Sequence, residues 1–432
     1  MNVGDLVDQG FAEIKTGPFG TQLRASDYVA TGRPVLNVKN VGFGDVRPWG
    51  FEYVDEVTAS RLSSHILKPN DIVFGRKGAV ERHAFITDKY DGAMQGSDCI
   101  RLRIADDSPI PARFITFALR TKQHQAWIQA FCSHGATMAS LNQEIVRRIP
   151  LPKLDPPQID LAVAVLQNFD SFLENNRRRI QVLEKMARAI YREWFVKFRY
   201  PGHEDVPMVD SALGPIPEGW DLSTCGDELR FIGGGTPSKK DPSYWDGGSV
   251  AWYTPSDLTK TRWRYASAPE LRITQSGVAK SSARLFPAGS VMMTSRATLG
   301  VLAVATTEAT TNQGFIVILP DSRWTSGFIY EWLASNAVEL AALGTGATFK
   351  EITKGSFKKF PFIVPAQDVL DTYKATAEPL EAQIHNLENQ TRQLTRLRDL
   401  LLPKLVTGEI DVSTLDLDSL TSIGSLGEAM EV

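Results

Sequence analysis

Residues 169–194, FDSFLENNRRRIQVLEKMARAIYREW, decide the architecture of this chain. Within this stretch, one series of residues is spaced alternately by four and by three positions. The series consists of Phe169, Leu173, Asn176, Ile180, Leu183, Ala187, Ile190 and Trp194. Such spacing is the heptad seam of a helix that packs against another long helix, here interrupted by one polar residue, Asn176. The pattern therefore predicts a long helix from about Asp160 to Phe198.

A second stripe of the same kind lies near the end of the chain. It consists of Leu380, Ile384, Leu387, Thr391, Leu394 and Leu401, within a helix expected from Val369 to Leu402. Pro379 is the one breaker in the two helices and predicts a kink or a late start. Each stripe could instead be the core face of an ordinary helix. The predicted lengths favour the paired interpretation, because globular helices average about 11–12 residues.

The segments that precede the two helices repeat one another. Gly135-Ala136-Thr137 and the following Arg147–Pro150 recur, 211 residues later, as Gly346-Ala347-Thr348 and Lys358–Pro361. Three further matches, with small gaps, pair Leu67–Val73 with Leu285–Val291, Gln95-Gly96 with Gln313-Gly314, and Phe114-Ile115 with Phe328-Ile329. Matches in the same order predict a tandem duplication, whose two helices pair antiparallel if the halves are related by a pseudo-two-fold axis.

The predicted fold class is α+β, with two repeat-related globular domains separated by two long antiparallel coiled-coil helices. A polar linker rich in proline and glycine separates the halves. We place the domain boundaries as follows: first globular domain 1–155, first long helix 156–199, linker 200–220, second globular domain 221–365, second long helix 366–407, and acidic tail 408–432.

Composition excludes several classes of protein. The three cysteines, Cys99, Cys132 and Cys225, are too few and too far apart for a disulfide framework or a zinc knuckle, which favours a cytoplasmic location. The chain shows neither the apolar run of a signal peptide nor a membrane span. The net charge is −3, but six acidic residues follow the last basic one, Lys404; without them, 47 basic residues stand against 44 acidic ones.

Four segments resemble the specificity subunits of type I restriction–modification systems. They are LLLPKLVTGEI at 400–410, GPIPEGW at 214–220, GGGTPS at 233–238 and GPFGT at 17–21. The resemblance implies that each globular domain is a target-recognition domain that reads one half of a bipartite DNA site. It also implies that the helices set the gap between half-sites and dock two methyltransferase subunits. Separate restriction/translocase subunits would complete the enzyme, and S-adenosylmethionine would bind the methyltransferase rather than this chain.

Candidate site residues follow from the duplication and from side-chain chemistry. Arginine and lysine contact phosphates and guanine edges, and asparagine and glutamine contact adenine. Predicted DNA contacts are Arg76, Lys77, Arg82, Gln95, Lys239, Lys240, Tyr244, Tyr253, Ser295, Arg296, Gln313, Thr348 and Lys350. Predicted partner-docking residues on the helices are Asn176, Ile180, Leu183, Ile190, Trp194, Leu387, Leu394 and Leu401. A solvated surface role is the competing interpretation for each predicted DNA contact.

The sequence offers no catalytic or metal-binding pattern, so no catalytic or metal residues are predicted. Asp155-Pro156-Pro157-Gln158 lacks the aromatic residue with which an amino-methyltransferase would hold its target base, and it suits the start of a helix. The triple glycine at 233–235 lacks the lysine of a phosphate-binding loop. Two alternatives remain: a non-enzymatic coiled-coil assembly protein with two interaction domains, and a fused methyltransferase–endonuclease fragment.

Overall fold

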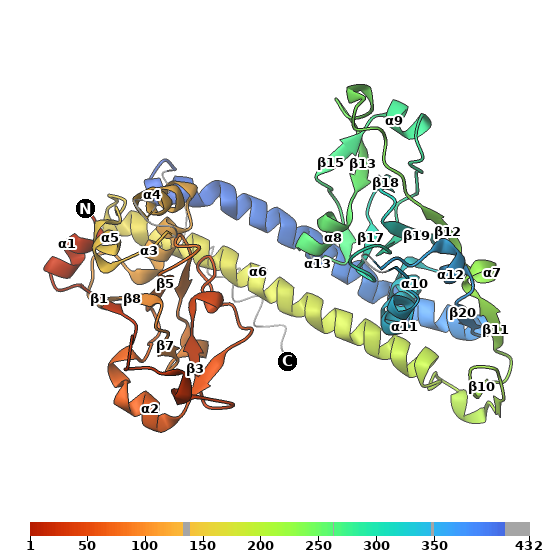
Figure 1. The fold of residues 1–432 in the computed structure, drawn as a ribbon, viewed down its shortest axis with the longest axis horizontal. Coiled ribbons are helices and arrows are strands. Elements are labelled where there is room, and N and C mark those ends of the chain that lie inside the picture. The colour runs from red at the N-terminus through yellow and green to blue at the C-terminus, as the bar shows by residue number, and fades with distance from the viewer. Residues whose placement is uncertain (133–138, 262, 347–349, 411–432) are drawn as a thin grey trace. The chain divides into compact units, whose positions relative to one another are not determined.

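The computed structural model describes residues 1–132, 139–261, 263–346 and 350–410, which form two compact units. Unit 1 contains Met1–Leu173 and the chain from Gln393 onward, and unit 2 contains Glu174–Arg392. Two long helices, α6 (Pro156–Tyr191) and α13 (Gln367–Thr407), each contribute one part to each unit (Figure 1). We call residues 1–155 the first lobe and residues 221–365 the second lobe.

The first lobe is built on an antiparallel sheet of order β1-β8-β5-β6. Its strands are β1 (Ala12–Thr16), β8 (Cys99–Ile104), β5 (Ile72–Gly75) and β6 (His83–Phe85). Four helices pack beside it: α1 (Val3–Asp8), α3 (Ala112–Leu119), α4 (Lys122–Cys132) and α5 (Gln143–Arg148). The core joins Phe74 and Leu102 of the sheet to Phe114 of α3, and it continues to Leu166 of α6 and Leu405 of α13.

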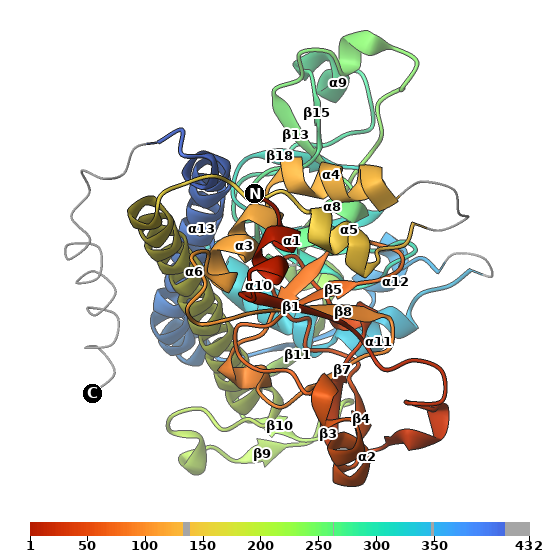
Figure 2. The same cartoon turned by 90° about the vertical axis from the view of Figure 1, so that its left-hand side faces the viewer.

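A second, smaller sheet of order β2-β4-β3-β7 completes the first lobe. Its elements are β2 (Tyr28–Val29), β4 (Glu52–Val54), β3 (Arg33–Leu36) and β7 (Met94–Gln95), with helix α2 (Glu56–Arg61) beside them. In Figures 1 and 2, β3 and α2 lie at the opposite end of the lobe from α1, α4 and α5. The first lobe therefore has a helical end and a β end.

The second lobe has the same plan. Its main sheet has the order β12-β19-β16-β17-β14, from β12 (Arg230–Gly233), β19 (Phe315–Leu319), β16 (Val291–Thr294), β17 (Leu302–Ala305) and β14 (Tyr265–Ala266). Its smaller sheet is β15 (Leu271–Ile273), β13 (Val250–Tyr253) and β18 (Ala309–Thr311). The helices are α7 (Cys225–Glu228), α8 (Pro255–Thr261), α9 (Gln275–Ala279), α10 (Ser326–Ser335), α11 (Ala337–Ala342) and α12 (Lys354–Lys358). Figure 1 shows β13, β15 and α9 at the end away from α10 and α11.

Strand pairing confirms the predicted duplication. The order β1-β8-β5-β6 recurs as β12-β19-β16-β17, and β4-β3-β7 recurs as β15-β13-β18. Both smaller sheets contain one parallel pair, β3 with β7 and β13 with β18. The register corrects two predicted matches. Ile72 pairs with Leu102 as Val291 pairs with Ile318, so Val291 corresponds to Ile72 and not to Val73. Gln95 pairs with Leu36 as Thr311 pairs with Tyr253, so Gln95 corresponds to Thr311 and not to Gln313. The Gln-Gly dipeptides were therefore aligned two residues out of register.

The two long helices begin 211 residues apart, at Pro156 and Gln367. In unit 1 the beginning of α6 packs against the end of α13, and in unit 2 the end of α6 packs against the beginning of α13, as antiparallel helices do. In unit 2, the ring centroids of Tyr191 and Tyr373 lie 6.2 Å apart. The predicted late start at Pro379 is wrong, because α13 is continuous from Gln367 to Thr407. A π-helical turn, Arg192–Val196, ends α6 instead.

The predicted linker is an ordered part of unit 2. Two short strands, β9 (Met208–Val209) and β10 (Ile216–Pro217), form a hairpin. Trp220 is buried and stacks on Tyr200 with ring centroids 5.4 Å apart. Strands β11 (Asp221–Thr224) and β20 (Pro361–Val364) then pair antiparallel and close the second lobe. Of the helices described, none is both long enough and apolar enough to span a bilayer.

Candidate nucleic-acid interface

In the first lobe, one predicted basic pair lies directly after β5. The Arg76 N–H donates to the Asp98 carbonyl at 2.8 Å, and the Leu141 N–H donates to the Arg76 carbonyl at 2.9 Å. Arg76 is half-buried, whereas the Lys77 side chain is exposed and its Nζ lies 3.2 Å from an Asp98 carboxylate oxygen. The backbone on both sides thus fixes the position of a cationic side chain that stays open to solvent.

The second lobe repeats this arrangement after β16. The Ser295 N–H donates to the Gly314 carbonyl, and the Ile352 N–H donates to the Ser295 carbonyl, both at 2.8 Å. Ser295 therefore occupies the place of Arg76, and Arg296 that of Lys77. Arg296 Nη2 lies 2.7 Å from Glu351 Oε2 on an exposed surface. Each lobe thus presents a cation at the equivalent strand end, although each cation is already paired with a carboxylate.

The glycine turns that precede these sites are close backbone crossings. A Cβ on Gly17 would lie 2.0 Å from the Gly96 carbonyl oxygen, and one on Gly234 would lie 2.1 Å from the Asn312 carbonyl oxygen. The two positions are repeat-equivalent, because Thr16 and Gly233 end the matching strands. Beyond the crossing, the Thr236 hydroxyl donates to Gln313 Oε1 at 2.6 Å. The triple glycine therefore packs backbone against backbone and orders the edge on which Gln313 is exposed.

Three predicted DNA contacts are wrong because their side chains are buried. Gln95 is 0% exposed, and its amide donates to the carbonyls of Lys15 and Cys99. Tyr253, the last residue of β13, and Ser295, directly after β16, are also buried. A side chain that is enclosed by its own sheet cannot reach a base edge. Thr348 lies outside the described residues.

The remaining predicted contacts lie at the surface but do not form one cluster. Lys239, Lys240 and Lys350 are exposed, and Tyr244 is half-buried at the end of a short 3-10 turn. Arg82 is half-buried, with its guanidinium carbon 5.4 Å from the ring centroid of Phe43. These positions remain predictions of DNA contact.

Sequence reasoning missed three exposed aromatic residues of the first lobe. Phe19 is 63% exposed, Trp49 is 65% exposed, and Phe43 is exposed beneath Arg82. Each adjoins a glycine, in Phe19-Gly20, Gly42-Phe43-Gly44 and Trp49-Gly50. The neighbouring glycines could have predicted this exposure, because an aromatic residue in a glycine turn has no strand or helix to bury it. Exposed aromatic rings are suited to contact with bases and sugars, and Phe43 also lies beside a cation, Arg82.

The described residues contain no group of three or more side chains that could hold a metal ion. Burial raises the pKa of Cys99 to about 12 and that of Cys132 to about 11, so neither thiol is a nucleophile at neutral pH. Pro156 begins α6, so the Asp-Pro-Pro-Gln segment is a helix start here.

The predicted docking residues on the helices lie mainly in the internal seam. Asn176, Ile180 and Leu387 are buried, and Leu183, Ile190 and Trp194 pack against the core of unit 2. Leu401 packs against the core of unit 1, and Leu394 is half-buried. As direct partner contacts, the buried residues are wrong, because the chain uses this seam for its own helix pairing.

The outer faces of the helices offer a different apolar surface. On α6, Met186 is exposed and Ala189 lies one turn further along; on α13, Leu397 and Leu400 are exposed. Met186 and Leu397 are related by the 211-residue shift, and so are Ala189 and Leu400. We call these pairs the α6 patch and the α13 patch. Their equivalence provides one copy of the same kind of surface in each unit.

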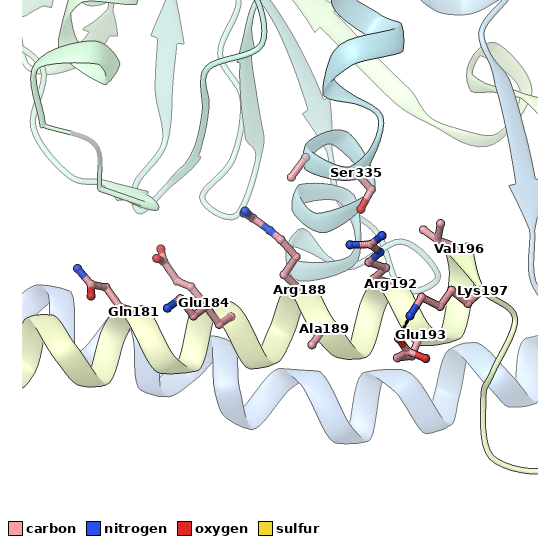
Figure 3. Close-up of a pocket in the computed structure, with 11 residues that line it drawn as sticks. Gln181, Glu184, Arg188, Ala189, Arg192, Glu193, Val196, Lys197 and Ser335 are labelled. Atoms are coloured by element: carbon pink, nitrogen blue, oxygen red, sulfur yellow. Dashed lines mark hydrogen bonds and ion pairs between the residues drawn. The ribbon is translucent and has the colours of Figure 1, made fainter. Parts of the chain in front are cut away.

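A groove of about 790 Å³ borders the α6 patch in unit 2 (Figure 3). Side chains of α6 and its π-helical turn form one wall, and Ala334 and Ser335 of α10 form the other. Its charged residues are Glu184, Lys185, Arg188, Arg192, Glu193 and Lys197. Cations outnumber carboxylates, and Lys197 Nζ is 2.5 Å from Glu193 Oε1. The groove suits a predominantly acidic surface.

Comparisons with known proteins agree on one family. A model described as type I restriction modification DNA specificity domain matches residues 217–394. The chain is 31% identical, over 206 residues, to the type I restriction enzyme MjaIX specificity subunit of Methanocaldococcus jannaschii, in a match that spans 47% of this chain and 46% of that relative. It is 26% identical to the HindI specificity subunit of Haemophilus influenzae, over 87% of this chain and 94% of that one.

A solved structure shares the fold. The type I restriction–modification S subunit from M. genitalium superposes with a TM-score of 0.61 at 14% identity, over 94% of this chain and 95% of that one. This likeness extends to both lobes and both long helices, since it covers nearly the whole chain.

Proposed function

The chain belongs to the specificity subunits of type I restriction–modification systems, and from that premise we propose that it selects a bipartite DNA target for a separate modification enzyme. Each lobe reads one half-site. The chain directs methylation and performs none itself, and S-adenosylmethionine binds the modification subunit. The observation that supports the proposal most is the duplication, which places an exposed cation at the same strand end in each lobe, Lys77 and Arg296.

The proposed DNA surface in the first lobe includes Lys77, Arg82 and the exposed rings of Phe19, Phe43 and Trp49. In the second lobe it includes Lys239, Lys240, Arg296, Gln313 and Lys350. Cations at these positions neutralise phosphates and fix the position of the lobe on duplex DNA, while neighbouring side chains read base edges. The carboxylates that now pair with Lys77 and Arg296 are displaced when phosphate takes their place.

Two modification subunits are the proposed partners of the α6 and α13 patches. Repeat-equivalent apolar surfaces fit two copies of one partner, and exposed apolar patches are typical of protein contacts. Restriction/translocase subunits then complete the nuclease. This assignment replaces the seam residues, which are engaged within the chain.

The test is to co-express the chain with its modification subunit and to map methylated adenines by long-read sequencing. We expect one bipartite sequence, methylated only when both subunits are present. Methylation by the isolated chain would contradict the proposal. Native mass spectrometry of Met186→Asp and Leu397→Asp should show one modification subunit lost from each complex. Val57→Asp, at an exposed site on α2, is the matched control.

The competing function is a coiled-coil assembly protein with two interaction domains and no DNA role. It would explain the duplication and the helices equally well, but not the cations at the strand ends. Binding to duplex DNA that weakens steeply with salt separates the two, because only a phosphate-binding surface releases counterions.

A further inference from the structure

Unit 2 contains a buried cluster of charged side chains that the proposed function does not use. Arg264 lies directly before β14. It is only 1% exposed and is one of the largest fully buried side chains among the described residues. Its Nη1 lies 2.7 Å from Glu331 Oε1 of α10, and its Nη2 lies 2.5 Å from Glu381 Oε1 of α13. The guanidinium also lies over the Tyr330 ring, 3.9 Å from its centroid. One arginine thus joins the edge of the second lobe to α10 and α13.

The backbone of the same segment is held by a second carboxylate of α13. Glu388 accepts the N–H of Arg264 at 2.8 Å and the N–H of Tyr265 at 3.0 Å. The Tyr265 hydroxyl donates to Glu381 Oε2 at 2.9 Å. Arg392, one turn beyond Glu388, donates to Glu388 at 3.0 Å and to the Tyr265 carbonyl. Both the side chains and the backbone of residues 264–265 are therefore bonded to side chains of α13.

The cluster also reaches α6 at the wall of the groove. Arg188 of α6 lies with its Nε 3.6 Å from Glu331 Oε2, and Figure 3 shows its side chain extending from the helix toward the lobe. Glu331 itself is fully buried. Within unit 2, the chain of contacts Arg188–Glu331–Arg264–Glu381 runs from one long helix through the lobe to the other.

The carboxylates around Arg264 stabilise its charged form. Burial alone would lower the pKa of Arg264, but the carboxylates of Glu381 and Glu331 more than offset this and raise it. Burial raises the pKa of Glu381 and of Glu388, and hydrogen bonds and cations in the cluster oppose the rise. Such clusters add little net stability, since an apolar replacement of similar volume packs as well. They penalise any shift that separates the partners, because a lone buried charge is costly.

We propose that Arg264, Glu331, Glu381 and Glu388 form a positioning element that fixes the orientation of the second lobe on its helices and thereby restricts the complex to one spacer length between half-sites. An apolar seam alone would tolerate small rotations and slips of the lobe. A rotation or slip of the lobe would instead break the ion pairs of Arg264 and the backbone hydrogen bonds to Glu388. This inference rests on the proposed function, because spacer length has meaning only for a bipartite DNA reader.

The test removes the charges together and maps methylation in the intact complex. The triple variant Arg264→Met, Glu331→Gln, Glu381→Gln leaves no lone buried charge. We expect it to methylate the same half-sites, with sites one base pair longer or shorter gaining about tenfold relative to the original spacer, which corresponds to 1.4 kcal/mol. Glu388→Gln, which retains the side-chain shape, should shift the spacer distribution in the same direction and serves if the triple variant does not fold.

The control is Lys260→Met with Glu270→Gln, which removes an exposed pair, 2.9 Å apart, from the same lobe. It should leave the spacer distribution unchanged. A purely structural role would lower methylation equally at all spacers, and that result in the triple variant and in Glu388→Gln would overturn the inference. If the unaltered complex methylated no bipartite site, the proposed function would fail instead.

Discussion

The two units use the same position of their long helices in different ways. Asp170 of α6 and Glu381 of α13 are separated by the 211-residue shift of the duplication. Asp170 forms an ion pair with Arg120, which follows α3, at 2.8 Å. Glu381 forms an ion pair with Arg264, which precedes β14. The helix supplies an equivalent carboxylate in both units, and an unrelated element of each lobe supplies the arginine.

The surroundings of the two carboxylates differ as well. The Asp170 side chain is 23% exposed, and Arg113 and Arg398 lie 3.7 and 3.4 Å from it. The Glu381 side chain is 11% exposed, and its arginine is sealed from water. Loss of one arginine leaves Asp170 hydrated and still paired. Loss of Arg264 leaves the buried carboxylate of Glu381 without a counter-charge and leaves Glu331 only the more distant Arg188, 3.6 Å away. Loss of one arginine should therefore destabilise the contact between the first lobe and its helices only slightly. In the second lobe, the same loss should destabilise that contact strongly.

The largest expected effect tests this difference directly. Arg264→Met should lower the free energy of unfolding of unit 2 by about 3–5 kcal/mol, the usual result of breaking a buried ion pair from one side. Arg120→Met should cost unit 1 about 1 kcal/mol, because solvent and two other arginines compensate. Hydrogen–deuterium exchange with mass spectrometry measures the opening of each unit separately. Equal losses in the two units would remove the distinction.

A feature common to both units gives the next effect. Gly17→Ala and Gly234→Ala each drive a Cβ against a carbonyl oxygen, at 2.0 and 2.1 Å. We expect each to destabilise its own unit by about 3 kcal/mol, the upper range for overpacking against backbone. Gly247→Ala, at a positive-φ turn with open space around it, separates conformational strain from the clash. Effects that differ widely between Gly17 and Gly234 would show that the two crossings are not equivalent.

The duplication and the long helices were predictable because their signals are periodic. The four-three spacing of apolar residues predicted the long helices, and the shift of 211 residues predicted that they are repeat-equivalent. Both signals can be read without knowing the loop conformations. The residues of the site were harder to predict. Gln95 is a polar residue directly after an apolar one, a pattern that is also expected of an exposed side chain. Its amide instead donates a hydrogen bond to the carbonyl of Lys15, which lies 80 residues earlier in the chain. No local pattern reveals such a partner.

The buried cluster of unit 2 was invisible for the same reason. Trp263-Arg264-Tyr265 has the composition of an exposed basic–aromatic segment, and the partners of Arg264 are 67 and 117 residues away. The helix stripe did mark the correct face of α13, since Ile384, Leu387 and Thr391 are buried there. The stripe could not show that two acidic residues beside it in the sequence, Glu381 and Glu388, are also buried.

Buried histidines create a third difference between the units. Among the described residues, His83 of unit 1 has its pKa lowered to about 3, chiefly by burial and also by Arg120. Because the folded pKa lies below the unfolded value of 6.5, its contribution is complete above pH 6.5 and is lost as the pH falls toward 3. Unit 1 should therefore lose about 2 kcal/mol between pH 7.5 and pH 5 from this residue.

Exchange-corrected opening free energies at pH 7.5 and pH 5 measure this loss in each unit. His83→Gln should flatten the pH dependence of unit 1 without removing it, because His65 and His124 also have pKa values lowered by burial. In unit 2, His385 has a lowered pKa but is only partly buried, so the pH dependence there should be shallower. A steeper acid loss in unit 2 than in unit 1 would reverse this part of the comparison.

The smallest effect on folding is expected where the two units are most alike. Lys77→Ala and Arg296→Ala each break an exposed ion pair, so each should change the free energy of unfolding by less than about 1 kcal/mol. If both cations contact phosphate, each variant should also weaken binding of duplex DNA and lower the slope of log affinity against log salt by about 1. Titrations at several salt concentrations measure this slope. An unchanged slope in one variant alone would mean that the two strand ends meet DNA differently, despite their shared geometry.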